Sequence, residues 1–225
     1  MAFFVSCVVP AYNAEHYLRE ALESVLRQTR PPDEIIVVDN GSTDGTLALL
    51  QSIPNVLVLH QPIRGPGATR NLGIQASQGK MLTFLDADDK WHPEKIDRQL
   101  DVFRATPDTK LCVAHIQNFW SPEIDPPEHD ARLLQPWRGY TFSSLMVQRD
   151  VFKQIGLLDE KLMVGEDGDW FLRFRNSGLP HKLLPEVLSY RRLHDENTSR
   201  LMAAESRDAM LRRFKNQLDQ HKSEQ

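Results

Sequence analysis

Short apolar runs alternate with helical segments in the first half of this chain, and this alternation limits the fold more than any other feature. The runs FFVSCVV, EIIVVD, NVLVLH and MLTFLD are rich in Val, Ile, Leu and Phe, which is typical of strands buried on both faces. Between them, residues 14–28, 43–53 and 68–78 are predicted to be helical, with Ser42 capping the second helix. Strands that alternate with helices require crossover connections. The sequence therefore predicts an α/β fold with a Rossmann-like, mostly parallel central sheet flanked by helices.

Composition narrows the class of protein. With 225 residues, of which 40% are apolar, the chain suits one large or two small domains, and we expect a single domain. A net charge of -4 argues against a nucleic-acid-binding protein. Cys7 and Cys112 lie in apolar runs, so we expect buried, reduced thiols and a cytoplasmic protein. The apolar run over residues 2–9 is too short to cross a membrane, and no transmembrane segment is expected.

The second half of the chain is less regular. Residues 93–105 are predicted to form a helix that begins with Pro93, and residues 110–117 a strand. Residues 118–139 are rich in proline and acids, and suit either a long loop or an ordered insertion. Residues 181–193 are expected to be extended with a proline break. The tail over residues 203–218 has one apolar helical face, which suits docking on the core or on a second subunit, or contact with a membrane.

Polar residues follow three of the predicted strands, in the segments PAYN, DNGSTDG and DADD. The carboxyl ends of parallel strands meet at one edge of a sheet, where ligands bind. Two common nucleotide motifs are excluded. The first strand does not lead into G-x-G-x-x-G, and GKM at residues 79–81 lacks the other residues of a P-loop. If the crevice binds a nucleotide, it does so by another arrangement.

Three carboxylates in four positions end the run FLDADD. Their mutual repulsion costs energy unless solvent or a cation relieves it. Mg²⁺ and Mn²⁺ prefer oxygen ligands and usually take one or two carboxylates together with water and phosphate oxygens. We predict that Asp88 binds the cation and that Asp86 contacts a sugar or ribose. The alternative is a solvated turn.

Other residues near the strand ends suit a nucleotide. Asp39 and Asn40 offer an acceptor and an amide to a base or to ribose hydroxyls, or form an Asx turn. Tyr12 suits stacking on a base or packing in the core. Arg70 follows glycines at the start of a helix, which suits either a diphosphate or a surface salt bridge.

A second acidic cluster lies in VGEDGDW, at the start of a predicted helix. Glu166, Asp167 and Asp169 are favoured there by the helix dipole, whatever their function. Beside a metal-type cluster, they also suit a carboxylate that takes a proton from an attacking hydroxyl.

Five segments in this order and spacing resemble the family 2 inverting glycosyltransferases of the GT-A fold. The resemblance covers roughly Val5 to Ser199, and the ordered set is specific although each motif alone is weak. The segments are VVPAYNAEHYLREALESVLRQT, EIIVVDNGSTDGT, GATRNLGI, GKMLTFLDADD and GEDGDWFLRF.

The resemblance implies roles for particular residues. It places the donor nucleotide against residues that follow the first strands and against the D-x-D motif, which is formed by residues 86–88. It implies that Asp88 is the ligand for Mn²⁺ or Mg²⁺. It implies that Asp167 is the general base, with Glu166 beside it. Trp170, Arg191 and His194 are expected to contact the acceptor or the diphosphate. The nucleotide-binding residues implied are Pro10, Tyr12, Glu15, Asp39, Asn40, Arg70, Asp86 and Ala87.

The resemblance also implies an organisation and a reaction. Residues 1–116 would bind the nucleotide-sugar, 117–200 would hold the acceptor and the base, and 201–225 would form a C-terminal helix. The reaction would pass a sugar to a glycan or glycolipid hydroxyl with inversion, from a UDP or dTDP donor; many members have Asp where this chain has Asn40. Peripheral contact with the inner face of a membrane and a homodimer are expectations at the family level. The alternatives are a sugar nucleotidylyltransferase and a non-catalytic nucleotide-sugar-binding module.

Overall fold

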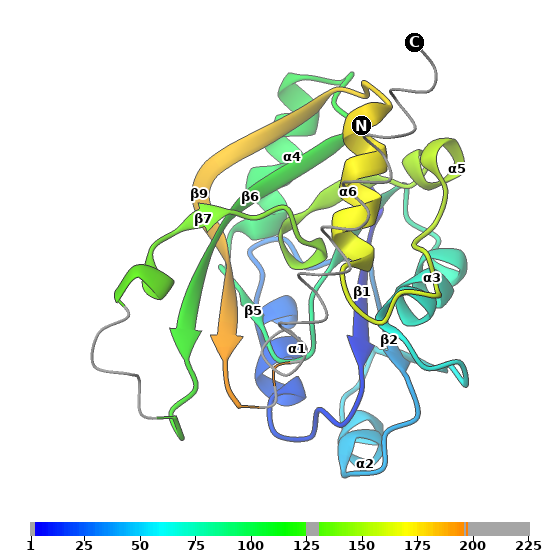
Figure 1. The fold of residues 1–225 in the computed structure, drawn as a ribbon, viewed down its shortest axis with the longest axis vertical. Helices are drawn as coiled ribbons and strands as arrows, with labels where there is room; N and C mark the ends of the chain where they lie inside the picture. Colours follow the sequence, from blue (N-terminus) through cyan, green and yellow to red (C-terminus); the bar gives the residue numbers. More distant parts are fainter. Residues whose placement is uncertain (1–2, 125–130, 196, 198–225) are drawn as a thin grey trace, which may run out of the picture.

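The computed structural model describes residues 3–124, 131–195 and 197, and in these a nine-stranded sheet forms the centre of the molecule (Figure 1). The strand order is β3-β2-β1-β4-β8-β6-β9-β5, and β7 pairs with β6 outside this path. The strands are β1 Val5–Ala11, β2 Glu34–Asp39, β3 Leu57–His60, β4 Met81–Phe84, β5 Lys90–Trp91, β6 Leu111–Trp120, β7 Trp137–Arg138, β8 Met146–Gln148 and β9 His181–Leu193.

The strands β3, β2, β1 and β4 run parallel to one another, as the alternating sequence predicts. The strand β1 lies between β2 and β4, so the chain order reverses on either side of it. A crevice forms beyond the carboxyl ends of strands at such a reversal. The strand β8 then joins β4 and β6 in antiparallel pairs, while β6 and β9 are parallel.

Helices cover both faces of the sheet (Figure 1). Alternate residues of β1 point to opposite faces: Val9 packs with α1 and α4, and Val8 with α3. Gly73 of α3 lies directly on the sheet, because an added Cβ would be 2.3 Å from Val8. The helices are α1 Leu18–Leu26, α2 Thr46–Gln51, α3 Pro66–Ala76, α4 Lys95–Ala105, α5 Val151–Ile155 and α6 Glu166–Asn176, with short 3-10 turns at Ala131–Leu134 and Phe142–Ser144.

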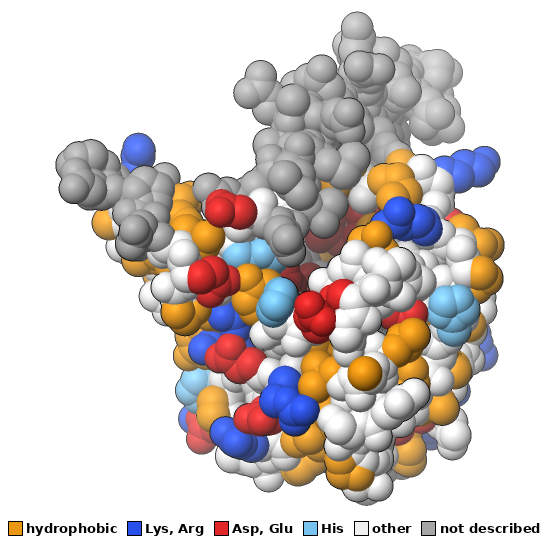
Figure 2. Space-filling model, turned by 90° about the horizontal axis from the view of Figure 1, so that it is seen from below, with side chains coloured by type: hydrophobic (Ala, Val, Ile, Leu, Met, Phe, Trp, Pro, Cys, Tyr) orange, Lys and Arg blue, Asp and Glu red, His pale blue; other side chains and the backbone are white. Residues whose placement is uncertain are grey.

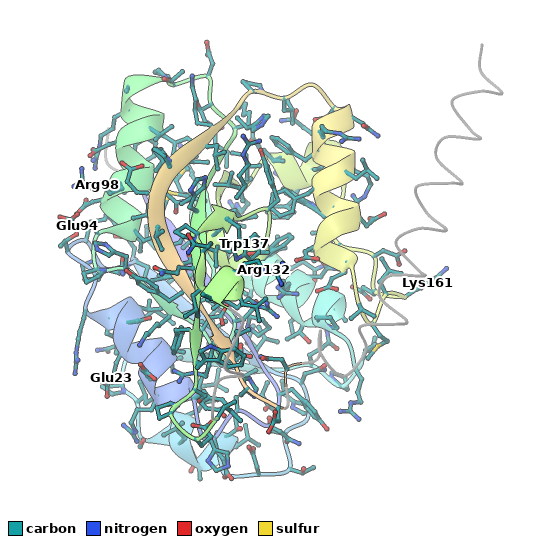
Figure 3. All side chains as sticks on the ribbon, turned by 60° about the vertical axis from the view of Figure 1, so that its left-hand side comes forward. Glu23, Glu94, Arg98, Arg132, Trp137 and Lys161 are labelled. Atoms are coloured by element: carbon teal, nitrogen blue, oxygen red, sulfur yellow. The ribbon has the colours of Figure 1, made fainter. Side chains whose placement is uncertain are left out.

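The outer surfaces of the helices carry charged residues. Glu94 and Arg98, at the start of α4, lie one helical turn apart and form an ion pair of 3.1 Å on the outside of the molecule (Figure 3). Exposed pairs of this kind contribute little to stability. The described part of the chain contains no helix long and apolar enough to cross a bilayer.

Several sequence expectations need correction. The strand β3 is an edge strand with exposed apolar side chains, rather than a strand buried on both faces. Ser42 does not cap α2, because its hydroxyl accepts a hydrogen bond from the Asn13 N–H while Gly45 holds the N-cap position. Within residues 118–139, the described parts contain the end of β6, a 3-10 turn and β7. The predicted helix at 203–218 lies outside the described residues.

The proline break in β9 is an irregularity in its pairing. Ala114 of β6 faces Leu184, and the next residue, His115, faces Val187, so Pro185 and the residue after it are left out of the pairing. Proline has no N–H to donate to a sheet, which explains why the pairing skips it. Beyond the break the pairing continues to Leu193, so β9 carries its last residues to the edge where β1, β2 and β4 end.

The buried interior contains an unpredicted cation. Lys95 is fully buried and donates to Thr83 Oγ1, Gln99 Oε1 and Leu145 O. Burial lowers the pKa of Lys95 to about 7. The unfolded chain then binds more protons than the folded one between this pKa and the ordinary lysine value, so this group makes stability rise with pH over that range. Cys7 and Cys112 are buried free thiols, as predicted.

Candidate active site

The predicted site residues gather at the carboxyl edge of the sheet. Figure 2 views this side of the molecule, and acidic and histidine side chains cluster near its centre. The turn after β4 contributes Asp86 and Asp88, α3 contributes Arg70, and the start of α6 contributes Glu166 and Asp167. Residues from both halves of the sequence therefore meet at this edge.

Arg70 joins the two acidic clusters. Its Nη2 donates to Asp86 Oδ1 at 2.6 Å, and its Nη1 donates to Glu166 Oε1 at 2.7 Å. The sequence suggested a diphosphate contact or a surface salt bridge for Arg70, but the guanidinium is buried and both of its terminal nitrogens bind carboxylates. Its planar fork suits such double binding. Arg70 therefore connects the D-x-D turn to α6 rather than offering a free fork to a ligand.

Charge and burial oppose each other in this network. Burial disfavours the charged guanidinium of Arg70, but Asp86 and Glu166 more than compensate and raise its pKa. Burial raises the pKa of Glu166 and of Asp167, and Arg70 opposes both shifts. Asp167 also accepts the N–H of Gly168 at 2.7 Å. A carboxylate with a raised pKa is a better proton acceptor, which suits a general base.

The last residues after β9 lie against Asp88. Asp88 Oδ2 is 3.0 Å from His194 Nε2 and accepts a hydrogen bond of 3.2 Å from Asn197 Nδ2. His194, predicted to contact the acceptor or the diphosphate, therefore lies against the aspartate predicted to bind the cation. His194 Nδ1 is buried and has no partner among the described residues.

The donor set fits a hard divalent cation bound together with a diphosphate. Within the described residues, no hydrogen bond reaches Asp88 Oδ1, and the Asp88 side chain is 32% exposed. The same residues contain no group of three or more His, Cys, Asp or Glu side chains that could hold a metal by themselves. One carboxylate oxygen with phosphate oxygens and water is an ordinary set for Mg²⁺ or Mn²⁺. Asp88 would hold such a cation.

Asp39 and Asn40 bind the backbone in this structure. Asp39 has no exposed surface and accepts the N–H groups of Gly41 and Ser42, which is the Asx turn considered as the alternative. Asn40 Nδ2 donates to Gln61 O and Ile63 O, at 2.9 and 2.8 Å. Asn40 Oδ1 accepts the Gly65 N–H. The Asn40 amide, predicted to contact a nucleotide, thus binds the loop between β3 and α3 in this structure.

The remaining nucleotide-site predictions lie near the ends of β1 and β2. Pro10 is in β1 opposite Val38. Tyr12 follows β1 and is 44% exposed, with the Arg64 guanidinium 4.3 Å from its ring centroid. Glu15 Oε2 accepts the Gly45 N–H at 2.5 Å. Ala87 is buried between the two aspartates of the D-x-D motif. The Tyr12 ring is thus the exposed aromatic surface of this region.

Trp170, predicted to contact the acceptor or the diphosphate, is buried in this structure. Its side chain has no exposed surface, packs against Phe142 and Phe152, and donates from Nε1 to Gly156 O. An exposed aromatic residue that the sequence did not single out lies beside α6. Tyr140 is 41% exposed, and its ring contacts Phe171, which lies one helical turn after Asp167 on α6.

Arg192 is a further residue of the site that was not predicted. It is 3% exposed, and its Nε donates to the carbonyl oxygen of Asp88 at 2.9 Å. The sequence YRRLH contains two adjacent arginines, and neighbouring residues of a strand point to opposite faces. Arg191, the predicted ligand contact, lies near enough to lower the pKa of the Asp89 carboxyl, which burial raises. Without the strand's orientation, the sequence could not show which arginine is buried.

Comparisons with known proteins place this chain in a family. The glycosyl transferase family 2 pattern matches residues 6–175. An uncharacterized glycosyltransferase of Rickettsia prowazekii is 30% identical over 214 residues, which cover 87% of this chain and 65% of the relative. TuaG of Bacillus subtilis, a putative teichuronic acid biosynthesis glycosyltransferase, is 38% identical over 102 residues, covering 43% of this chain and 40% of TuaG.

The fold is also that of a solved protein. S. aureus TarS 1-349, in complex with UDP-GlcNAc, superposes with a TM-score of 0.68 at 21% identity, covering 86% of this chain and 59% of that one. This likeness confirms the predicted GT-A fold. The chain spans about two thirds of the length of the R. prowazekii relative. The family pattern covers the strand endings, the D-x-D turn and the start of α6, and the chain belongs to glycosyl transferase family 2.

Proposed function

We propose that this chain transfers a sugar from a nucleoside-diphosphate donor, with UDP or dTDP preferred, to a hydroxyl of a glycan or glycolipid, with inversion. The observation that carries the proposal is the pair of hydrogen bonds from Arg70, which brings Asp86 of the D-x-D turn and Glu166 of α6 into one network. A single displacement needs a diphosphate-binding group and a base on the same site. Family membership and the UDP-GlcNAc complex of TarS support the donor class.

The proposed reaction is one in-line displacement. The acceptor oxygen forms a bond to the anomeric carbon, while the bond from that carbon to the diphosphate oxygen breaks and its electron pair leaves with the diphosphate. Asp167 takes the proton of the acceptor hydroxyl, and its raised pKa favours that step. Attack from the side opposite the leaving group inverts the configuration of the sugar.

Asp88 would hold the cation that binds the diphosphate. When bound there, Mn²⁺ or Mg²⁺ would neutralise charge on the leaving group. His194 and Asn197 hold the other oxygen of Asp88 and so orient the carboxylate. The positive charge of Arg70 offsets part of the negative charge of Asp86 and Glu166, which limits repulsion among the acids of the site.

For the acceptor, we propose that Tyr140 supplies the exposed aromatic ring beside α6. Such a ring presents apolar area to a sugar while its hydroxyl remains in water. Tyr140→Ala should raise the KM for the acceptor and leave the KM for the donor unchanged.

Cytoplasmic placement at the inner face of a membrane, and assembly as a homodimer, belong to the same proposal.

The melting temperature tests the donor and the cation together. It would be measured with UDP, dTDP, GDP and CDP, each with Mn²⁺ and with a chelator. Binding at about 100 times Kd stabilises the folded state by about 2.7 kcal/mol, which corresponds to roughly 5–10 °C for a domain of this size. One nucleotide that stabilises only with Mn²⁺ is the expected result. No shift with any nucleotide would contradict the proposal.

Two other functions make different predictions. A sugar nucleotidylyltransferase would release pyrophosphate from a nucleoside triphosphate and a sugar phosphate. A non-catalytic module would bind a nucleotide-sugar without transferring or hydrolysing the sugar. The presence of both Asp88 and Asp167 beside the network of Arg70 favours the transferase over both alternatives. Analysis of the products formed from each donor distinguishes the three functions.

A further inference from the structure

Arg192 is a buried cation held between two aromatic rings. Its guanidinium carbon lies 4.8 Å from the ring centroid of Tyr17 and 4.6 Å from that of Phe119. Its Nη2 donates to Glu20 of α1, which is half exposed. Burying a charge is costly unless hydrogen bonds and an opposite charge compensate. Arg192 has both, so its side chain is confined to one position.

That position is defined relative to the D-x-D turn. The Arg192 Nε donates to Asp88 O at 2.9 Å, and its backbone N–H donates to Asp89 Oδ1 at 2.9 Å. Arg192 thus holds the turn by its side chain and by its backbone, from the end of β9. Through Glu20, the same side chain fixes the turn relative to α1.

The backbone carbonyl of Arg192 also binds Asn197, a second partner of Asp88. Asn197 Nδ2 donates to Arg192 O at 3.2 Å and to Asp88 Oδ2 at 3.2 Å, so one amide spans both residues. Asn197 Oδ1 accepts the backbone N–H of His194. In the described part of the chain, every hydrogen bond recorded to Asp88 comes from Arg192, His194 or Asn197. The strand end and the turn after it therefore clamp this one aspartate.

We propose that Arg192 is a positioning residue for the divalent cation: it acts through Asp88, whose backbone carbonyl its side chain binds, and so keeps the turn in the arrangement that leaves Asp88 Oδ1 available. The proposal rests on the proposed function, since it concerns the same cation. Partners that orient a metal ligand typically change metal affinity about 10- to 100-fold when removed. Arg192 would contact neither the cation nor the sugar.

The test measures metal affinity without turnover. Mn²⁺ would be titrated at saturating UDP, or at whichever of UDP, dTDP, GDP and CDP stabilises the protein. The midpoint of the rise in melting temperature would be determined for each protein relative to its own metal-free value. Arg192→Met should move this midpoint to about 10- to 100-fold higher Mn²⁺. Arg192→Lys keeps the charge but loses the fork, so its midpoint should lie between Met and wild type.

The control is Arg98→Met, which removes an exposed arginine of α4. A midpoint for Arg192→Met equal to that of Arg98→Met would overturn the proposal, even if the metal-free melting temperature fell. If Arg192→Met does not fold, Arg192→Lys and Glu20→Gln serve instead, and unchanged midpoints in both overturn the proposal. A wild type without any metal-dependent shift would overturn the proposed function as well, which separates the two failures.

Discussion

The carboxylates after β4 and those at the start of α6 meet at Arg70, but their surroundings differ. Asp86 and Asp88 are each about one-third exposed, and each accepts hydrogen bonds from at least two side chains. Glu166 is almost fully buried and forms its recorded ion pair with Arg70, and burial raises its pKa and that of Asp167. The first environment suits a cation and the second suits a proton, because hydrogen-bond donors favour a charged carboxylate whereas burial favours a protonated one.

The largest effect is expected at Asp167. Asp167→Asn should lower kcat by about 10²- to 10⁴-fold, since an amide cannot take the acceptor proton. Nucleotide affinity, measured by calorimetry with Mn²⁺, should stay within a factor of about two, because Asp167 is proposed to take a proton and not to bind the nucleotide or its cation. Asp169→Asn, on the same helix and paired with Arg173, is the matched control. Equal losses of kcat and nucleotide affinity would show that Asp167 takes part in binding the cation or the nucleotide.

Asp88→Ala should abolish metal-dependent binding of the nucleotide. The roughly 5–10 °C stabilisation that the nucleotide gives only with Mn²⁺ should vanish, so that the melting temperatures with Mn²⁺ and with chelator become equal. Thermal unfolding in both conditions measures this. If the metal-dependent stabilisation survives in Asp88→Ala, then the cation is held by other residues and Asp88 is not its ligand.

Arg70→Lys tests the link between the two clusters. Lysine retains the charge but cannot bind Asp86 and Glu166 with one planar fork. Arg70 lowers the pKa of Asp167, so a weaker interaction should raise that pKa. The acid limb of kcat/KM should then move to higher pH, by roughly one unit for each 1.36 kcal/mol of interaction lost. An unchanged limb, with Arg98→Lys as the control, would show that Arg70 does not act on the base.

The smallest effect is on stability. The folded-state pKa of Asp167 is raised, so the folded protein binds more protons than the unfolded chain between the unfolded and folded pKa values. Stability from this group is therefore lost as pH rises through that window. Asp167→Asn should melt higher than wild type at pH 8, by about 2–4 °C for each kcal/mol, and the gap should close in acid. A gap independent of pH would contradict the raised pKa.

The first half of the chain was largely predictable from sequence. Runs of Val, Ile and Leu that end in PAYN, DNGSTDG and DADD identify parallel strands and the edge where they finish, since local composition and order are enough for that. The acidic pair Glu166 and Asp167 was likewise visible at a helix start. Through the family resemblance the sequence also singled out His194 as a contact for the acceptor or the diphosphate, but its contact with Asp88 became visible only in the structure.

Other assignments depended on side-chain direction, which sequence does not specify. Trp170 and Phe171 are neighbours on α6, yet Trp170 is the one with no exposed surface. Arg191 and Arg192 are adjacent in β9, and Arg192 is the one that reaches Asp88. Asn40 was predicted to contact a ligand, but the loop between β3 and α3 takes up its amide.

By itself, the sequence determined the α/β class, the edge at which the site lies and the acids available there, because strand composition and strand order follow from local patterns. Only the tertiary structure decided that Arg70 joins Asp86 to Glu166 and that Arg192 holds Asp88. Those contacts connect residues separated by much of the chain. Their geometry depends on how strands and helices pack, and no local pattern contains that information.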